Sequence, residues 1–186
     1  MFIVLIVMYS EKEKQDMLKL AREAIETAYK GESPKLPEGL SEKRGVFVTI
    51  KKNNKLRGCI GFPDAIYPLK EAIAKAARAA AFNDPRFPPL KEEELKDVEI
   101  EISILTPKEE IAPDPQNVTI GKHGLIVEYG LLSGLLLPQV AVEQGWDAEE
   151  FLNQVCIKAG MPPFAWKHMP IKLYRFEAEV FNETQL

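Results

Sequence analysis

The most informative part of this chain of 186 residues is residues 45–62, which read GVFVTIKKNNKLRGCIGF. Two strand-like runs, 45–52 and 55–62, lie on either side of Asn53-Asn54. Asparagine tolerates the positive φ that a tight hairpin turn requires, so the pair predicts a two-residue turn. Short turns join strands that run antiparallel. The stretch therefore predicts an antiparallel hairpin.

The position of the turn predicts which side chains share a face of the hairpin, because side chains alternate along a strand. One face is predicted to carry the cysteine and its alternate neighbours: Val46, Val48, Ile50, Arg57, Cys59 and Gly61. The other face is predicted to carry Phe47, Thr49, Leu56, Gly58 and Ile60. Since apolar residues occur on both faces, we expect a sheet that is covered on both sides, at least near its centre.

Helices are predicted before and after this hairpin. Ser10 and Glu13 fit a capping box, and the residues that follow are apolar at intervals of three and four. A second helix is predicted from Pro68 to about Phe82, and its many alanines would let it lie close to the sheet. Residues 97–105 alternate between apolar and polar side chains, which predicts a third strand.

The second half of the chain is also mixed. Residues 106–117 contain three prolines and predict a loop, whereas 124–129 and 131–142 predict strands. A third helix is predicted over 147–160 and a last strand over 174–180. We therefore predict an α+β domain in which helices flank a mostly antiparallel sheet.

Composition is that of an ordinary globular protein. Apolar residues make up 46% and charged residues 28%, which excludes a disordered chain, a fibre and a multi-span membrane protein. The 24 basic and 28 acidic residues give a net charge of −4, which argues against general attraction to nucleic acid or to anionic membranes. The two cysteines do not form a disulfide framework, so we expect free thiols in a reducing, cytoplasmic compartment.

Residues 1–8, MFIVLIVM, form an uninterrupted apolar segment. A membrane-spanning helix needs about 20 such residues. A secretory signal needs a basic front and a small-residue cleavage site, and neither is present. We therefore interpret residues 1–9 as an extension that packs as a strand on the sheet or on another subunit, and residues 10–186 as one domain. A homodimer remains among the expected assemblies.

The strongest candidate for a catalytic or binding site is the motif Leu56-Arg57-Gly58-Cys59-Ile60-Gly61. Residues i and i+2 of a strand share a face about 6 to 7 Å apart, so Arg57 and Cys59 are expected side by side. A nearby guanidinium would favour the thiolate. Gly58 and Gly61 would leave the backbone bare for a ligand to approach. The alternative is a small core cysteine in a strand bent by glycines.

A catalytic thiolate requires a base, and the chain contains only two histidines. His123 lies in a glycine-flanked turn and is the candidate base, whereas His168 lies in a proline-rich loop. Glu101 is predicted on the polar face of its strand, where it could orient the histidine or act as an acid and base. The alternative for each of these residues is a solvated surface position.

The motif Asp84-Pro85-Arg86-Phe87 is typical of a type I turn. One hypothesis is that Asp84 merely binds its own backbone. The other is that Arg86 lies over a cleft and clamps an anion.

The sequence predicts no metal or cofactor site, because it lacks Cys-x-x-Cys, His-x-x-x-His and phosphate-binding glycine motifs. Four cations cluster near the hairpin turn: Lys51, Lys52, Lys55 and Arg57. Such a cluster suits RNA phosphates, but lysines on an exposed strand also prevent pairing with other chains. Nucleic acid is therefore not the expected partner.

Three motifs, in this order, resemble the AMMECR family, which is named for a human chromosomal-deletion region and is found in archaea, bacteria and eukaryotes. They are LRGCIG at 56–61, DPRFPPL at 84–90 and GLLLPQV at 134–140. The resemblance covers roughly residues 10–181. It implies an α+β fold with a larger and a smaller lobe and a cleft near the cysteine motif, and we expect an archaeal member.

The biochemical role of that family is unsettled, so the resemblance implies no reaction. The first hypothesis is an enzyme with Cys59 as nucleophile, Arg57 stabilising the thiolate or binding an anionic group, His123 as base and Glu101 orienting it. The second is a non-catalytic module that binds a protein or a nucleotide-like small molecule through the same groove. The binding residues would then be Arg57, Gly58, Gly61, Asp84 and Arg86.

Overall fold

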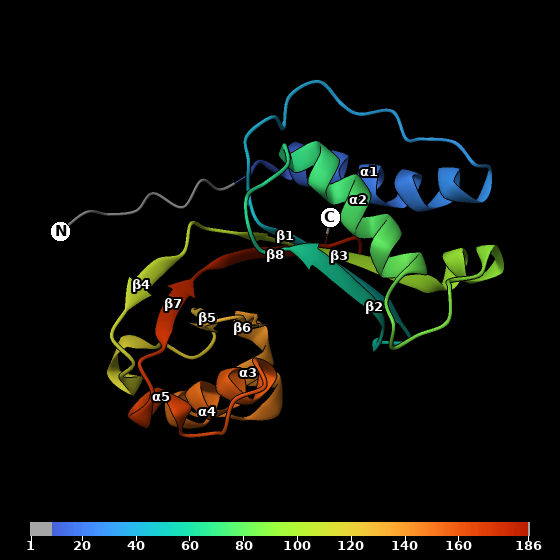
Figure 1. Cartoon of the computed structure of the whole chain (residues 1–186). Coiled ribbons are helices and arrows are strands. Elements are labelled where there is room, and N and C mark those ends of the chain that lie inside the picture. Colours follow the sequence, from blue (N-terminus) through green and yellow to red (C-terminus); the bar gives the residue numbers. More distant parts are fainter. Residues whose placement is uncertain (1–8, 186) are drawn as a thin grey trace. The chain divides into compact units, whose positions relative to one another are not determined.

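The computed structural model describes residues 9–185 and divides into two compact units (Figure 1). The first unit comprises the described chain up to Leu105 together with the chain from Glu179, and the second comprises Thr106–Ala178. Each unit contains a four-stranded antiparallel sheet and its own helices, which confirms the α+β class. Residues 1–8 of the predicted extension 1–9 lie outside the described residues.

The first unit begins with helix α1 (Glu11–Tyr29). Ser10 Oγ accepts a hydrogen bond from Glu13 N at 3.3 Å, and Glu13 Oε2 accepts one from Ser10 N at 2.8 Å. This reciprocal pair is the predicted capping box, and it satisfies two amides that would otherwise have no partner at the helix end. The predicted start of the helix is therefore confirmed.

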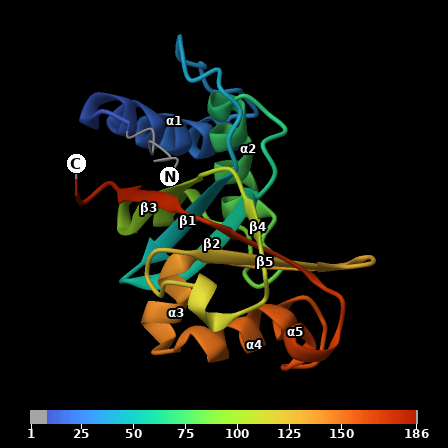
Figure 2. The same cartoon turned by 90° about the vertical axis from the view of Figure 1, so that its left-hand side faces the viewer.

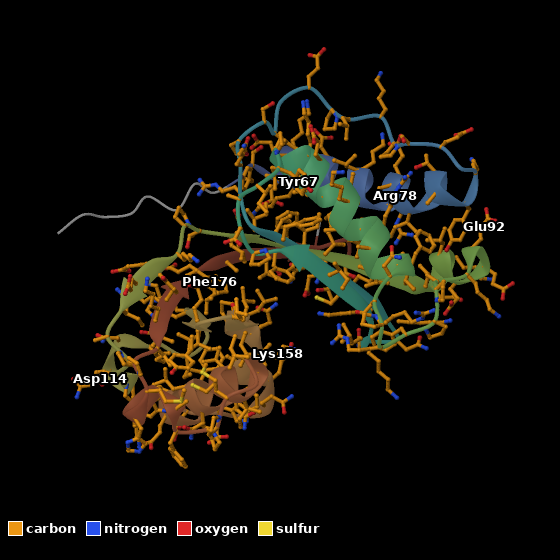
Figure 3. All side chains as sticks on the ribbon, viewed as in Figure 1. Tyr67, Arg78, Glu92, Asp114, Lys158 and Phe176 are labelled. Carbon is orange, nitrogen blue, oxygen red and sulfur yellow. The ribbon has the colours of Figure 1, made fainter. Side chains whose placement is uncertain are left out.

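Helix α2 (Leu69–Phe82) lies beside α1, and both cover one face of the first sheet (Figure 1). Arg78, labelled in Figure 3, connects the two helices. Its Nε donates to Ala24 O at 2.8 Å and its Nη2 donates to Thr27 Oγ1 at 3.1 Å. The alanine-rich face of α2 is buried, as expected of a helix that lies close to a sheet.

The first sheet has the strand order β2-β1-β3-β8. Its strands are β1 (Val46–Lys52), β2 (Lys55–Phe62), β3 (Val98–Leu105) and β8 (Ala178–Asn182), and a 3-10 helix η1 (Glu92–Asp97) precedes β3. Asn53 and Asn54 have φ values of 51° and 59°, so the predicted hairpin turn is confirmed. The helix-covered face carries fully or almost fully buried residues: Val46, Val48, Ile50, Ile100, Ile102 and Ile104.

The second unit contains the second sheet, of order β4-β7-β5-β6. Its strands are β4 (Glu109–Ile111), β5 (Gly124–Tyr129), β6 (Leu132–Leu136) and β7 (Lys172–Phe176). Its helices are η2 (Pro115–Asn117), α3 (Pro138–Gln144), α4 (Ala148–Lys158) and α5 (Ala165–His168). Figure 2 shows α3, α4 and α5 on one side of this sheet, where Phe151, Leu152 and Cys156 are fully buried.

Three sequence-based expectations for this region were wrong. The predicted loop 106–117 contains β4 and η2, because one short strand is too brief to show a period. The predicted strand 131–142 ends at Leu136, and Pro138 begins a helix, a position at which proline loses no hydrogen bond. The last predicted strand is two strands in different sheets, since Glu177 N donates to Thr106 Oγ1 at 2.9 Å between them.

Candidate functional site

Strand β2 contains a β-bulge that changes which side chains lie beside Cys59. Ile50 pairs with Gly58 and Lys51 pairs with Leu56, so Arg57 is an extra residue without a partner of its own. A shift of one residue exchanges the two faces of a strand. The predicted faces were therefore wrong beyond the bulge. Cys59 pairs with Thr49 and lies on the face opposite α1 and α2.

Three polar residues form a row across this face, one from each of three adjacent strands, and we call it the thiol row: Cys59, Thr49 and Glu101. Thr49 Oγ1 lies 3.2 Å from Cys59 Sγ, within hydrogen-bond distance for sulfur. Thr49 also pairs with Glu101 of β3, which is only 8% exposed and accepts a hydrogen bond from Lys51 Nζ at 2.8 Å. Buried polar groups of this kind are costly, so they mark the row as a candidate site.

Ser103 extends the polar face beyond Glu101. It pairs with Phe47 of β1 and is fully buried, yet its Oγ has no hydrogen-bond partner among residues 9–185. A buried hydroxyl without a partner loses the hydrogen bonds it makes with water in the unfolded chain. Neither Ser103 nor Thr49 was among the site residues predicted from the sequence.

Asp84 fixes the backbone of Cys59. Its Oδ2 accepts hydrogen bonds from Cys59 N at 2.9 Å and from Arg86 Nη2 at 2.8 Å. Its Oδ1 accepts from Arg86 N and from Arg86 Nε, both at 3.0 Å. Phe87 N donates to Asp84 O at 3.1 Å, which is the hydrogen bond of the predicted turn. Asp84 thus binds its own turn and also the strand that carries the cysteine.

Arg86 is the cation whose charge lowers the pKa of the Cys59 thiol. Its guanidinium forms a fork with the Asp84 carboxylate, and Nη2 also donates to Cys59 O at 3.4 Å. The hydrogen bonds from Arg86 hold the pKa of the Asp84 carboxyl well below its usual range. The Arg86 side chain remains 52% exposed, so it can still meet a ligand.

Arg57 differs from the expectation that it lies beside the thiol. Its Nη2 and Nε donate to Glu94 at 3.0 and 3.3 Å, and its Nη1 donates to Pro88 O at 2.9 Å. These contacts hold the pKa of Glu94 at about 2, chiefly through the hydrogen bond from Arg57. The guanidinium therefore ties residues 83–90, which we call the edge loop, along the outer edge of β2.

Burial raises the pKa of the Cys59 thiol. The hydrogen bond with Thr49 and the charge of Arg86 act in the opposite direction, whereas the charges of Asp84 and Glu101 raise the pKa further. The thiol is consequently protonated at neutral pH. This differs from the expectation of an activated thiolate, because the cation expected beside the thiol is bound to Glu94 instead.

The two glycines of the motif have packing roles. A Cβ on Gly58 would lie 2.1 Å from Ala80 O of α2, and a Cβ on Gly61 would lie 2.3 Å from Val46 O. A real Cβ atom does not lie this close to a carbonyl oxygen. Glycine at these positions therefore lets α2 and β1 approach β2 closely. Their expected part in ligand binding stays a prediction.

His123 belongs to the second unit, at the start of β5. Its ring is buried, and Nδ1 accepts a hydrogen bond from Thr119 N at 3.0 Å. Burial lowers the pKa of His123, and the positive charges of Arg175 and Lys122 lower it further. The imidazole is therefore neutral at neutral pH. Its role as the base for Cys59 stays a prediction.

The cationic cluster at the hairpin turn is largely neutralised by acidic partners. Lys51 pairs with Glu101, and Lys52 and Arg57 both pair with Glu94. Three of the four cations thus share two carboxylates, which weakens the attraction for phosphates that the sequence pattern permitted.

Between residues 9 and 185, no three His, Cys, Asp or Glu residues cluster in a way that would hold a metal ion. Over the same range, no helix is both long enough and apolar enough to cross a membrane. Cys59 and Cys156 are both free thiols.

The α+β fold described above is that of a known class of proteins. The AMMECR1 family model matches residues 18–181. An archaeal protein from Thermococcus onnurineus is 52% identical, covering 95% of this chain and 94% of its own length, and one from Methanothermobacter thermautotrophicus is 47% identical, covering 94% and 96%. The chain therefore belongs to the AMMECR1 family.

A solved structure supports the same assignment. The crystal structure of an uncharacterised protein from Pyrococcus horikoshii superposes with a TM-score of 0.89 at 49% sequence identity. The match covers 94% of this chain and 93% of the other. The fold described above is thus a fold already observed by crystallography.

Proposed function

We propose that the surface around Arg86 and Cys59 binds a small ligand that carries a phosphate or carboxylate group. The observation that carries the proposal is the geometry of Arg86. Its guanidinium is held in one orientation by Asp84 while half of the side chain stays exposed. A cation that is already oriented loses little conformational freedom when an anion binds.

Arg86 retains hydrogen-bonding capacity after it has bound Asp84. Nε and Nη2 are engaged, but Nη1 donates to no group among residues 9–185. Arginine is suited to anionic oxygens because its planar group offers several donors in a fixed pattern. The neutral Cys59 thiol does not repel an anion.

A small molecule fits this surface better than an extended peptide. A peptide would have to add a strand along the outer edge of β2. The edge loop already occupies that edge, since Asp84 binds Cys59 N and Arg57 binds the carbonyl oxygens of Pro88 and Pro89. A nucleotide-like ligand, whose phosphates would meet Arg86, requires no displacement of this loop.

Isothermal titration with ADP and with inorganic phosphate tests the proposal. Binding to the wild type should weaken at least about tenfold in Arg86→Gln, because a hydrogen bond to a charged group contributes about 1.5–3 kcal/mol. Lys55→Gln removes the same charge from an exposed position on β2 and should leave the affinity unchanged. Arg86→Lys preserves a cation next to Asp84 and guards against a loss caused by unfolding. Equal affinity in wild type and Arg86→Gln, or no binding of either probe, refutes the proposal.

A thiol enzyme is the second candidate, and the fixed position of Cys59 favours it. Backbone N–H, backbone carbonyl and thiol of this residue each have a partner, as a nucleophile requires. Sγ would attack an electrophilic carbon while its proton passes to a base, for which Glu101 is the candidate within the same unit. The resting thiol is protonated, however, so this candidate needs the base to act during the reaction.

p-Nitrophenyl acetate tests the second candidate. Sγ would form a bond to the acyl carbon, p-nitrophenolate would leave, and the thiol proton would pass to the base. A nucleophilic Cys59 predicts one equivalent of p-nitrophenolate released rapidly per chain and none in Cys59→Ala. Absence of a rapid phase in the wild type removes this candidate and leaves the binding proposal unaffected.

A further inference from the structure

Asp84 is buried and unusually well connected for a residue in a turn. It is 4% exposed, and its two oxygens accept four hydrogen bonds. Three come from Arg86 and one comes from the backbone of Cys59, which lies 25 positions earlier in the chain. A turn alone requires only the bond to Arg86 N, so the remaining contacts need another explanation.

The contacts at Cys59 take the place of a neighbouring strand. Strand β2 is at the edge of its sheet, where backbone groups have no partner strand. Asp84 accepts the outward N–H of Cys59, and Arg86 donates to its carbonyl oxygen. The backbone position at Cys59 sets where Sγ lies relative to Thr49. The adjacent bulge at Arg57 makes this part of the strand irregular, so a contact that fixes it has a clear structural purpose.

The same carboxylate controls the charge beside the thiol. Arg86 would stabilise a thiolate at Cys59, but Asp84 neutralises Arg86 and itself disfavours a thiolate. The other charged group that acts on Cys59 is Glu101 of β3, which already pairs with Lys51. Within the described residues 9–185, Asp84 is thus the one residue whose side chain hydrogen-bonds both the Cys59 backbone and Arg86.

We infer that Asp84 is the positioning residue of this site and that it couples the reactivity of the Cys59 thiol to the binding of an anion at Arg86. The inference deepens the proposed function and rests on it only for the ligand. An anion bound to Arg86 would offset part of the positive charge that favours the thiolate. Ligand binding should therefore lower the reactivity of Cys59.

The pH dependence of iodoacetamide alkylation tests the inference, because the thiolate is the reacting form. Labelling of Cys59 and of Cys156 is followed separately by mass spectrometry of peptides. Cys156 is fully buried in the core of the second unit and therefore reports unfolding of that unit in the same sample, whereas circular dichroism of each variant reports unfolding of the first unit. No ligand is needed, so the outcome is independent of whether the proposed function holds.

Asp84→Asn should move the midpoint of the Cys59 profile down by about one pH unit and raise the rate at pH 7 about tenfold, since a carboxylate charge disappears and Arg86 acts unopposed. Glu94→Gln is the matched control. It removes a carboxylate that binds the neighbouring Arg57 but does not touch Cys59, so its profile should match the wild type. A residue that only stabilised the fold would leave the midpoint in place. An unshifted midpoint in Asp84→Asn, with Cys156 still protected, overturns the inference.

Asp84→Glu is the second variant, for the case that circular dichroism shows that Asp84→Asn unfolds. It keeps the charge but displaces it by one methylene, so the Cys59 rate should change by at least about threefold while Cys156 stays protected. A rate equal to that of the wild type overturns the inference. In a further arm, 50 mM phosphate should slow alkylation of Cys59 in the wild type. No slowing, together with the expected Asp84 effects, counts against the proposed ligand and against the coupling but not against the positioning role.

Discussion

Thr49 and Cys59 lie directly opposite each other on β1 and β2, and Thr49 Oγ1 is 3.2 Å from Cys59 Sγ. The pairing exists only because a bulge at Arg57 shifts the hairpin register by one residue. It brings the thiol onto the polar face of the sheet rather than onto the face that α1 and α2 cover. The chemistry of the candidate site therefore depends on this one irregularity.

Thr49→Val should raise the apparent pKa of Cys59 and slow its alkylation at neutral pH. The hydroxyl is the strongest influence that favours the thiolate, and valine has a similar volume but no donor. The measurement is the rate of labelling against pH. Thr49→Ser retains the hydroxyl and should behave like the wild type. A midpoint that falls in Thr49→Val would contradict the assigned hydrogen bond.

Gly58→Ala should destabilise the protein by at least about 2 kcal/mol, because the added Cβ would collide with the backbone of α2. Urea unfolding followed by circular dichroism measures this change. Gly31→Ala is the comparison. Gly31 has open space around it and a φ of 70°, so only backbone strain of about 1 kcal/mol is expected there. Equal effects at the two positions would disprove the packing role of Gly58.

Stability should fall as the pH falls from about 4.3 towards about 2. Glu94 has a pKa of about 2 in the folded protein, below the value of about 4.3 in an unfolded chain. A lowered pKa contributes stability above the unfolded value, and this contribution is lost as the pH falls through the folded value. Asp84 acts in the same direction. The free energy of unfolding, measured by thermal unfolding at each pH, should fall by about 2 kcal/mol less in Glu94→Gln than in the wild type over this range, after solvent screening.

Lys51→Met should cost more stability than Glu101→Gln. Lys51 is the cation that compensates the nearly buried Glu101 carboxylate, and its removal leaves that charge unpaired. We expect about 1–3 kcal/mol for Lys51→Met and recovery of part of it in the double variant. Chemical denaturation of all four proteins gives the coupling energy. A coupling of zero would mean that the ion pair does not stabilise the thiol row.

The hairpin itself was predictable, but its register was not. Asn53 and Asn54 predict a two-residue turn, and both residues have the expected positive φ. Apolar side chains alternate with small or polar ones on both faces, however, so burial alone does not select one register. Arg57 could be accommodated as an extra residue because its side chain reaches the edge loop. No local pattern reveals that contact in advance.

The contact between Asp84 and Cys59 likewise could not be predicted from local sequence. The turn at Asp84-Pro85-Arg86-Phe87 follows from local sequence preferences, and its hydrogen bond is present. The bond to Cys59 N joins residues 25 positions apart, and only the packed fold brings them together. The family resemblance, by contrast, was correct, because it rested on three motifs in a fixed order and the family model matches residues 18–181.

Cys59 of the free protein is expected to carry a neutral thiol, in a site that we propose binds an anion. The most direct measurement is the midpoint of Cys59 alkylation against pH in the unmodified protein, with Cys156 as the internal report of unfolding. Because burial raises the pKa of Cys59, the midpoint should lie above the value of about 8.5 that an ordinary cysteine has. A midpoint clearly below that value would contradict it and would favour a catalytic thiolate instead.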